Sequence, residues 1–141
     1  MKLTVLGPGC WGLTIAKLLN NNFENITVWG RNVDLTPELK EQKRVSKPLE
    51  IELDKKVEIT SDIKAAIKDA DIILLVVSTS GVRPVCEQIK QAGGLNKNQI
   101  MLNLSKGIEL PSLKRMSEVI LEILPDINFG VLSGPTLARE I

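Results

Sequence analysis

Residues 2–12 read KLTVLGPGCWG, and this stretch decides the fold. Its first five residues form a short, mostly apolar run with β-branched character, which predicts a buried strand. The run leads directly into a G-x-G-x-x-G turn, and the apolar residues after the turn recur at helical spacing: Trp11, Ile15, Leu18 and Leu19. A strand, a glycine turn and a helix in this order predict a dinucleotide-binding unit.

Each glycine of the turn has its own physical task in such a unit. Gly7 allows the sharp turn, Gly9 lets the backbone approach a pyrophosphate, and Gly12 lets the helix pack closely on the sheet. The free N–H groups and the dipole of the helix start then face the phosphates. The alternative, that the pattern is an accident of composition, is disfavoured by the strand before it and the helix after it.

Composition narrows the classes of function. The chain has 141 residues, 43% of them hydrophobic, which is enough for one domain with a sizeable core. Its 18 basic and 17 acidic residues leave a net charge of +1, so neither nucleic acid nor an anionic membrane is expected as a partner. The apolar runs are too short for a bilayer span or a signal peptide, and a cytoplasmic protein is expected. The sequence contains no histidine, which excludes histidine-based acid–base chemistry and zinc ligation by histidine.

The second strand, residues 26–29, bears on the choice of cofactor. An acidic residue about twenty positions beyond the glycines would bind the ribose 2′-hydroxyl of NAD. The sequence has Gly30-Arg31-Asn32 at this place. Arg31 can stack on adenine or pair with a 2′-phosphate, or it can be a solvated surface residue. The cofactor is therefore expected to be NADP or NAD, with a modest preference for NADP.

Further strands are expected near residues 57, 72, 100 and 129, and they mostly alternate with helices. This pattern predicts a single α/β domain with a doubly wound parallel sheet of the Rossmann type. Residues 72–77 lack polar alternation, as a central strand should. Residues 34–56 are polar and predict an exposed helix, capped by Thr36, and a long connection. An apolar stripe at helical spacing predicts a core-facing helix: Leu113, Met116, Ile120, Leu121 and Leu124.

Two loops at the carboxyl ends of predicted strands carry polar groups where ligands bind in open parallel sheets. Residues 78–81 read STSG, which suits a ligand site and suits simple helix capping equally well. Lys106 beside Gly107 suits an anion in the crevice, or is a surface lysine.

Four segments resemble the N-terminal domain of NAD(P)-dependent glycerol-3-phosphate dehydrogenase. They are the glycine turn, the WGR of residues 29–31, the KG of residues 106–107 and the LSGPTLAREI of residues 132–141, of which the last is the most specific. The resemblance implies an enzyme that reduces dihydroxyacetone phosphate to sn-glycerol 3-phosphate with NAD(P)H for glycerophospholipid synthesis. Residues 1–141 would be its NAD(P)-binding domain, without the helical C-terminal domain that carries the family's acid–base lysine. Such a chain is expected to bind cofactor without turnover.

The resemblance also implies roles for individual residues. Cys10, Trp11, Arg31 and Ala138 would contact the cofactor, together with the three glycines. Lys106 would contact cofactor and substrate, and Gly134 and Thr136 would lie at the substrate. No catalytic residue and no metal ligand is implied within the chain, and the full-length protein could form a homodimer. Two alternatives remain: a related NAD(P)-dependent reductase of another small acid, and a non-catalytic dinucleotide-binding module.

Overall fold

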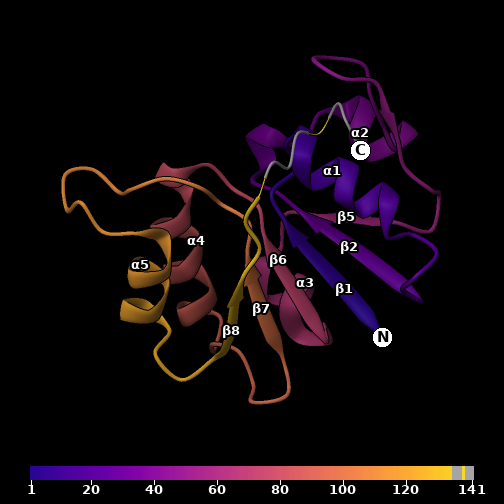
Figure 1. Ribbon diagram of the computed structural model, residues 1–141. Helices are drawn as coiled ribbons and strands as arrows, with labels where there is room; N and C mark the ends of the chain where they lie inside the picture. Colours follow the sequence, from indigo (N-terminus) through magenta and orange to yellow (C-terminus); the bar gives the residue numbers. More distant parts are fainter. Residues whose placement is uncertain (135–137, 139–141) are drawn as a thin grey trace.

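A parallel sheet of six strands forms the centre of the computed structural model, which describes residues 1–134 and 138 (Figure 1). The order across the sheet is β5-β2-β1-β6-β7-β8. The strands are β1 (Lys2–Leu6), β2 (Asn25–Trp29), β5 (Glu58–Thr60), β6 (Ile72–Leu75), β7 (Ile100–Asn103) and β8 (Asn128–Val131). Each neighbouring pair is parallel, so the predicted doubly wound α/β sheet is confirmed.

Helices cover both faces of this sheet, and an apolar cluster lies under each layer. One cluster joins the sheet to α3 (Ile63–Lys68), α4 (Thr79–Gln91) and α5 (Met116–Ile123). The other joins it to α1 (Cys10–Leu18) and α2 (Pro37–Gln42). The central strand β6 contributes to both clusters, Ile73 and Leu75 on one face and Leu74 on the other, because successive side chains of a strand alternate. This double burial explains its unbroken apolar sequence.

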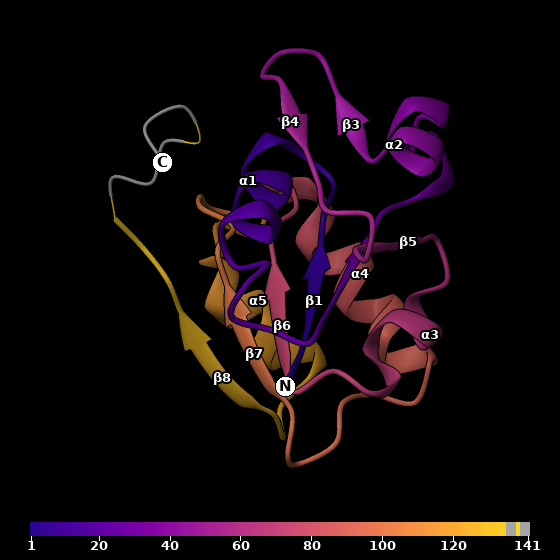
Figure 2. The ribbon, with the colours of Figure 1, turned by 90° about the vertical axis from the view of Figure 1, so that its right-hand side faces the viewer.

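The polar region from residue 34 to residue 56 holds more structure than the sequence indicated. The helix α2 begins as predicted, and the Thr36 hydroxyl oxygen accepts a hydrogen bond from the Leu39 amide at 3.2 Å. Beyond it, β3 (Arg44–Val45) and β4 (Ile51–Glu52) pair antiparallel and lie beside α1 and α2 (Figure 2). The sequence analysis predicted a helix and a long connection here, and it did not predict this pair of strands. Two-residue strands are too short to show a period, although Ile51 is buried.

The predicted apolar stripe is correct at Met116, Ile120 and Leu124 and wrong at two positions. Leu113 lies before the first turn of α5 and is 70% exposed, and Leu121 is 40% exposed. The buried face of α5 follows the spacing i, i+3, i+4 and i+7 instead: Met116, Val119, Ile120 and Ile123. Leu121 follows Ile120 by one residue, which turns its side chain about 100° away from that face.

Candidate functional site

The glycine turn connects β1 to α1, and its three glycines lie in three different environments. Gly7 has φ +126°, and a Cβ there would lie 2.5 Å from the Val76 carbonyl oxygen. A Cβ on Gly12 would overlap the Gly7 carbonyl oxygen, so close packing of the helix on the turn requires glycine. Gly9 has an ordinary φ of −71°, and a Cβ there would meet nothing within 4 Å. The open side of Gly9 is therefore where another molecule can approach the backbone.

The turn lies at the point where the sheet changes direction. From β1 the chain continues to β2 and β5 on one side, and from β6 it continues to β7 and β8 on the other. Ligands of open α/β sheets bind outside the carboxyl ends of the strands at such a switch point. A cleft of about 450 Å³ opens there. Its lining comes from the loops after β1, β2 and β6 and from α4: Gly7, Pro8, Gly9, Trp29, Gly30, Arg31, Asp34, Val76, Val77, Ser78, Ser80, Gly81, Pro84, Val85 and Gln88.

Two helices begin at this cleft, α1 after Gly9 and α4 after Ser78. Within the described residues, neither helix start receives a hydrogen bond from a side-chain cap. The first amides of a helix have no partner inside it and carry the positive end of its dipole, so both helix starts favour an anion in the cleft. The hydroxyls of Ser78 and Ser80 lie 3.2 Å apart on the cleft wall. Simple capping therefore does not explain these serines.

Arg31 and Asp34 form an ion pair on the wall of the cleft. The Arg31 Nε donates to Asp34 Oδ2 at 2.7 Å, and Nη2 donates to Oδ1 at 3.0 Å. The hydrogen bonds between the two side chains lower the pKa of Asp34 and raise the pKa of Arg31, because each group stabilises the charged form of the other. Asp34 is a site residue that the sequence analysis missed. It lies beyond the end of β2 in a 3-10 turn, η1 (Asn32–Asp34), and its spacing of three from Arg31 was the available signal.

Lys106 and Gly134 come together from loops that follow two neighbouring strands, β7 and β8. The Lys106 Nζ donates to the Gly134 carbonyl oxygen at 2.6 Å. On the other side, the Thr79 hydroxyl at the start of α4 donates to the Lys106 carbonyl oxygen at 2.8 Å. The loop of residues 106–115, called the lysine loop below, is thus attached both to Gly134 after β8 and to the helix that borders the cleft.

The remaining residues named from the sequence lie elsewhere. In the described part of the chain, Cys10 and Trp11 are absent from the cleft wall; their side chains are half-buried against the apolar cluster under α1. Ala138 lines a separate hollow of about 400 Å³ with residues of α1 and β4, including Thr14 and Ile51. Thr136 lies outside the described residues. Among the described residues, no cluster of histidine, cysteine or acidic side chains is suited to a metal ion.

The geometry and the fold define a class of protein. The fold and the cleft are those of a dinucleotide-binding α/β domain. In this class the sheet is parallel, and a glycine turn and free helix amides face the ligand at the switch point. Residues 2–141 match the family model described as NAD-dependent glycerol-3-phosphate dehydrogenase N-terminus. The chain therefore belongs to this family, as its motifs indicated.

Relatives and solved structures agree with this assignment. The chain is 40% identical to the glycerol-3-phosphate dehydrogenase (NAD(P)+) of Thermoanaerobacter sp. over 141 residues, which are 100% of this chain and 42% of that protein. It is 37% identical to the enzyme of the same name from Anaplasma phagocytophilum, covering 100% of this chain and 44% of that one. The crystal structure of glycerol-3-phosphate dehydrogenase from Coxiella burnetii superimposes with a TM-score of 0.85 at 23% identity, covering 99% of this chain and 42% of that chain, and this shows the shared fold.

The chain spans less than half the length of the curated relatives it matches. No helix in the described part of the chain has the length and apolar character needed to cross a membrane.

Proposed function

We propose that this chain is the cofactor-binding part of a glycerol-3-phosphate dehydrogenase. The whole enzyme would reduce dihydroxyacetone phosphate to sn-glycerol 3-phosphate with NAD(P)H, for glycerophospholipid synthesis. The observation that carries the proposal is the open side of Gly9, which faces a cleft at the switch point of the sheet. The curated relatives carry NAD(P)+ in their names, which agrees with this use of the cleft.

The residues around the cleft suit the parts of a dinucleotide. The pyrophosphate would lie against Gly9 and the first turn of α1, where Cys10 and Trp11 can contribute backbone amides, because the open backbone and the helix dipole favour an anion. The adenosine ribose would lie against Arg31, at the end of β2. The reduced nicotinamide supplies a hydride when it is bound. The described side chains bind and orient this cofactor.

The substrate end would lie where the β7 and β8 loops meet. Lys106 carries a positive charge there, and its Nζ already reaches the Gly134 carbonyl oxygen. A lysine suits a substrate that bears a phosphate and develops negative charge on oxygen during reduction. We place Gly134 and Thr136 at the substrate and Ala138 at the cofactor on the strength of the family motif that ends the sequence.

Activity needs the second domain of the family, and assembly concerns the full-length protein. The family resemblance assigns the acid–base lysine to a second, helical domain, so we propose that residues 1–141 bind cofactor without turnover. We further propose a cytoplasmic enzyme that forms a homodimer at full length. Light scattering of the full-length protein would show a mass of two chains, and a monomer at micromolar concentration would contradict this part.

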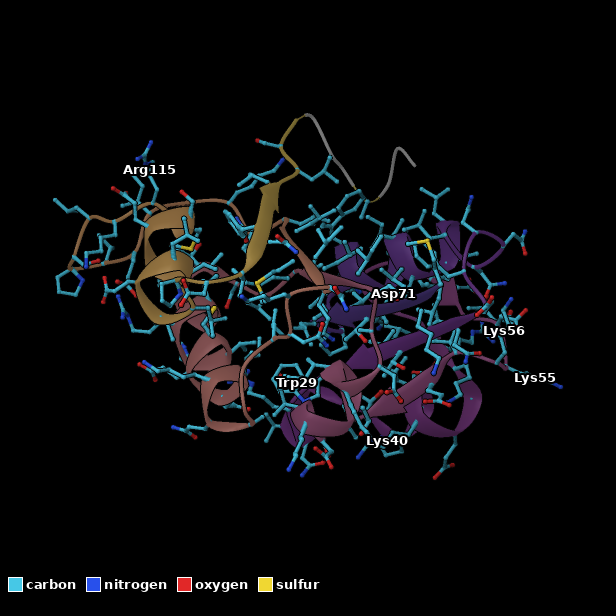
Figure 3. All side chains as sticks on the ribbon, turned by 90° about the horizontal axis from the view of Figure 1, so that it is seen from below. Trp29, Lys40, Lys55, Lys56, Asp71 and Arg115 are labelled. Carbon is cyan, nitrogen blue, oxygen red and sulfur yellow. The ribbon has the colours of Figure 1, made fainter. Side chains whose placement is uncertain are left out.

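Replacement of Gly9 tests the cleft directly. Gly9→Val places a side chain in the open space of the cleft, and its backbone at φ −71° and ψ 169° accepts a β-branched residue. We expect NADH and NADPH binding to weaken by about tenfold or more, which is about 1.4 kcal/mol, with an unchanged unfolding temperature. Titration followed by tryptophan fluorescence is suitable, because Trp29 borders the cleft and its ring lies inside the molecule (Figure 3). Full binding by a folded Gly9→Val variant would contradict the proposal.

A further inference from the structure

Ser105 is a buried polar residue between the end of β7 and the lysine loop. Its hydroxyl lies 2.7 Å from the Val77 carbonyl oxygen and 3.3 Å from the Leu75 carbonyl oxygen, and it can donate to either. The regular pairing of β6 with β7 ends where Leu75 lies opposite Asn103. The Ser105 hydroxyl therefore continues the connection between the two segments beyond the end of the paired strands.

The side chain of Asn103 fixes the backbone of Ser105. Its Nδ2 donates to the Ser105 carbonyl oxygen at 2.9 Å, and its Oδ1 accepts from the Ser105 amide at 3.1 Å. Asn103 is buried, so breaking either bond would leave a polar group without a partner, which is costly in the interior. The direction in which the chain leaves Ser105 toward Lys106 is therefore well defined.

A second hydroxyl joins the same two loops in the opposite sense. Ser105 donates from the loop after β7 to the loop after β6, and Thr79 at the start of α4 donates back to the Lys106 carbonyl oxygen. The approach is close, because Gly107 has φ +120° and a Cβ there would lie 2.8 Å from the Thr79 hydroxyl oxygen. Since Val77 lines the cleft, these bonds connect the cleft wall to the backbone that carries Lys106.

Thr4 provides a comparison, because it is a buried hydroxyl in another place. Its Oγ1 donates to the Ala66 carbonyl oxygen at 2.6 Å and so joins β1 to α3. Both hydroxyls satisfy a buried carbonyl group, so both contribute to stability. Ser105 differs in that the next residue along the chain is the lysine assigned to the ligands.

We propose that Ser105 is a positioning residue, which holds the backbone of Lys106 against the cleft wall at Val77 and so fixes the lysine relative to a dinucleotide in the cleft. This inference rests on the proposed function, in which Lys106 contacts the cofactor. Ser105 acts through the lysine and does not itself touch the cofactor. Without its hydroxyl, the lysine loop moves independently of the cleft wall, and the attraction between the ammonium group and the phosphates weakens with distance.

A double-mutant cycle separates this role from a purely structural one. The dissociation constants of NADH and NADPH are measured for the 141-residue chain with and without Lys106→Gln. The backgrounds are the unmodified chain, Ser105→Ala, and Ser105→Thr, which keeps the hydroxyl. The matched control background is Thr4→Val, which removes a buried hydroxyl elsewhere. Circular dichroism and the unfolding temperature establish that each variant is folded.

We expect Lys106→Gln to weaken cofactor binding by about fivefold or more in the unmodified, Ser105→Thr and Thr4→Val backgrounds, and by less than about twofold in Ser105→Ala. An equal effect in Ser105→Ala and in the unmodified chain would overturn the inference and leave the cofactor site standing. The same holds if Lys106→Gln has no effect in the unmodified chain, or if its effect is also lost in Thr4→Val or Ser105→Thr. If the folded, unmodified chain bound neither nucleotide, the proposed function would fail and this inference with it.

Thr79→Val decides the matter if Ser105→Ala does not fold. It removes the reciprocal hydrogen bond to the Lys106 carbonyl oxygen and keeps the shape of the side chain. It should reduce the effect of Lys106→Gln on cofactor binding to less than about twofold, and Thr79→Ser should restore that effect. An undiminished effect in folded Thr79→Val would then overturn the inference.

Discussion

Arg83 in α4 donates two parallel hydrogen bonds to Glu109 in the loop that follows β7, at 2.8 Å from Nε and 2.9 Å from Nη2. The same loop begins with Lys106, whose carbonyl oxygen accepts a hydrogen bond from Thr79 at the start of α4. One helix therefore borders the cofactor cleft with its first turn and holds the lysine loop through two side chains. The position of Lys106 relative to the cleft is fixed by α4.

Removal of the two hydrogen bonds from Arg83 to Glu109 should make the lysine loop more mobile and leave the fold intact. In Arg83→Gln we expect amide hydrogen exchange in residues 106–115 to accelerate about tenfold, because the loop loses one of its two attachments to α4. Exchange in β1 and β6 should stay unchanged. Mass spectrometry of peptic fragments gives both values, and equal protection of the loop in the variant would contradict the argument.

The pair of Arg83 and Glu109 should also make stability depend on pH in the acid range. Hydrogen bonds from Arg83 and then from Ser112 lower the pKa of Glu109 from 4.5 to about 2. The folded state therefore holds the carboxylate charged where the unfolded chain would protonate it. This contribution is complete above pH 4.5 and is lost as the pH falls toward 2.

Unfolding temperatures recorded across that interval provide the check. The unmodified chain should lose stability more steeply than Glu109→Gln between pH 4.5 and 2. Identical profiles for the two proteins would show that the pair contributes nothing to folding.

An added methyl group should destabilise the fold at Gly12, which lies in α1, and have little effect at Gly9, the N-cap residue of that helix. Gly12→Ala brings its Cβ against the Gly7 carbonyl oxygen, so the helix must shift away from the turn. We expect a loss of about 1–3 kcal/mol or more in the free energy of unfolding. Gly9→Ala meets nothing within 4 Å and should leave that free energy within about 0.5 kcal/mol. Urea unfolding of the two variants distinguishes them, and a stable Gly12→Ala would contradict the close approach.

The central strand should be the least tolerant of truncation. Leu75 in β6 is 0% exposed and Leu110 is 79% exposed. We expect Leu75→Ala to cost about 2–5 kcal/mol through lost burial and the cavity left behind. The control Leu110→Ala should cost less than about 0.5 kcal/mol. Similar midpoints of urea unfolding for both variants would mean that β6 is not packed as described.

The elements that the sequence predicted well are those whose burial leaves a long pattern. Residues 72–77 were assignable to a central strand because parallel strands covered on both faces are continuously apolar. The turn from Gly7 to Gly12 was assignable because close approach excludes every side chain at two of its positions. The pairing of β3 with β4 was not, since two residues in each strand show no alternation.

The parts of the site that the sequence did not predict depend on distances that spacing does not encode. Asp34 returns to the cleft through a single 3-10 turn, whereas the usual rule looks for an acid directly at the end of β2. The contact between Lys106 and Gly134 requires that β7 and β8 be neighbours, and strand order is a tertiary property. Cys10 and Trp11 belong to the recognised motif, yet packing turns their side chains to the core.

The switch point between β1 and β6 has a mechanical consequence. The sheet consists of two sets of three strands, one ending at β1 and the other beginning at β6, and these two strands are the seam between them. The cleft takes its walls from both sets, because Gly9 follows β1 and Ser78 follows β6. A nucleotide bound there would contact both sets of strands. Its binding free energy would then add to the free energy needed to separate the two sets.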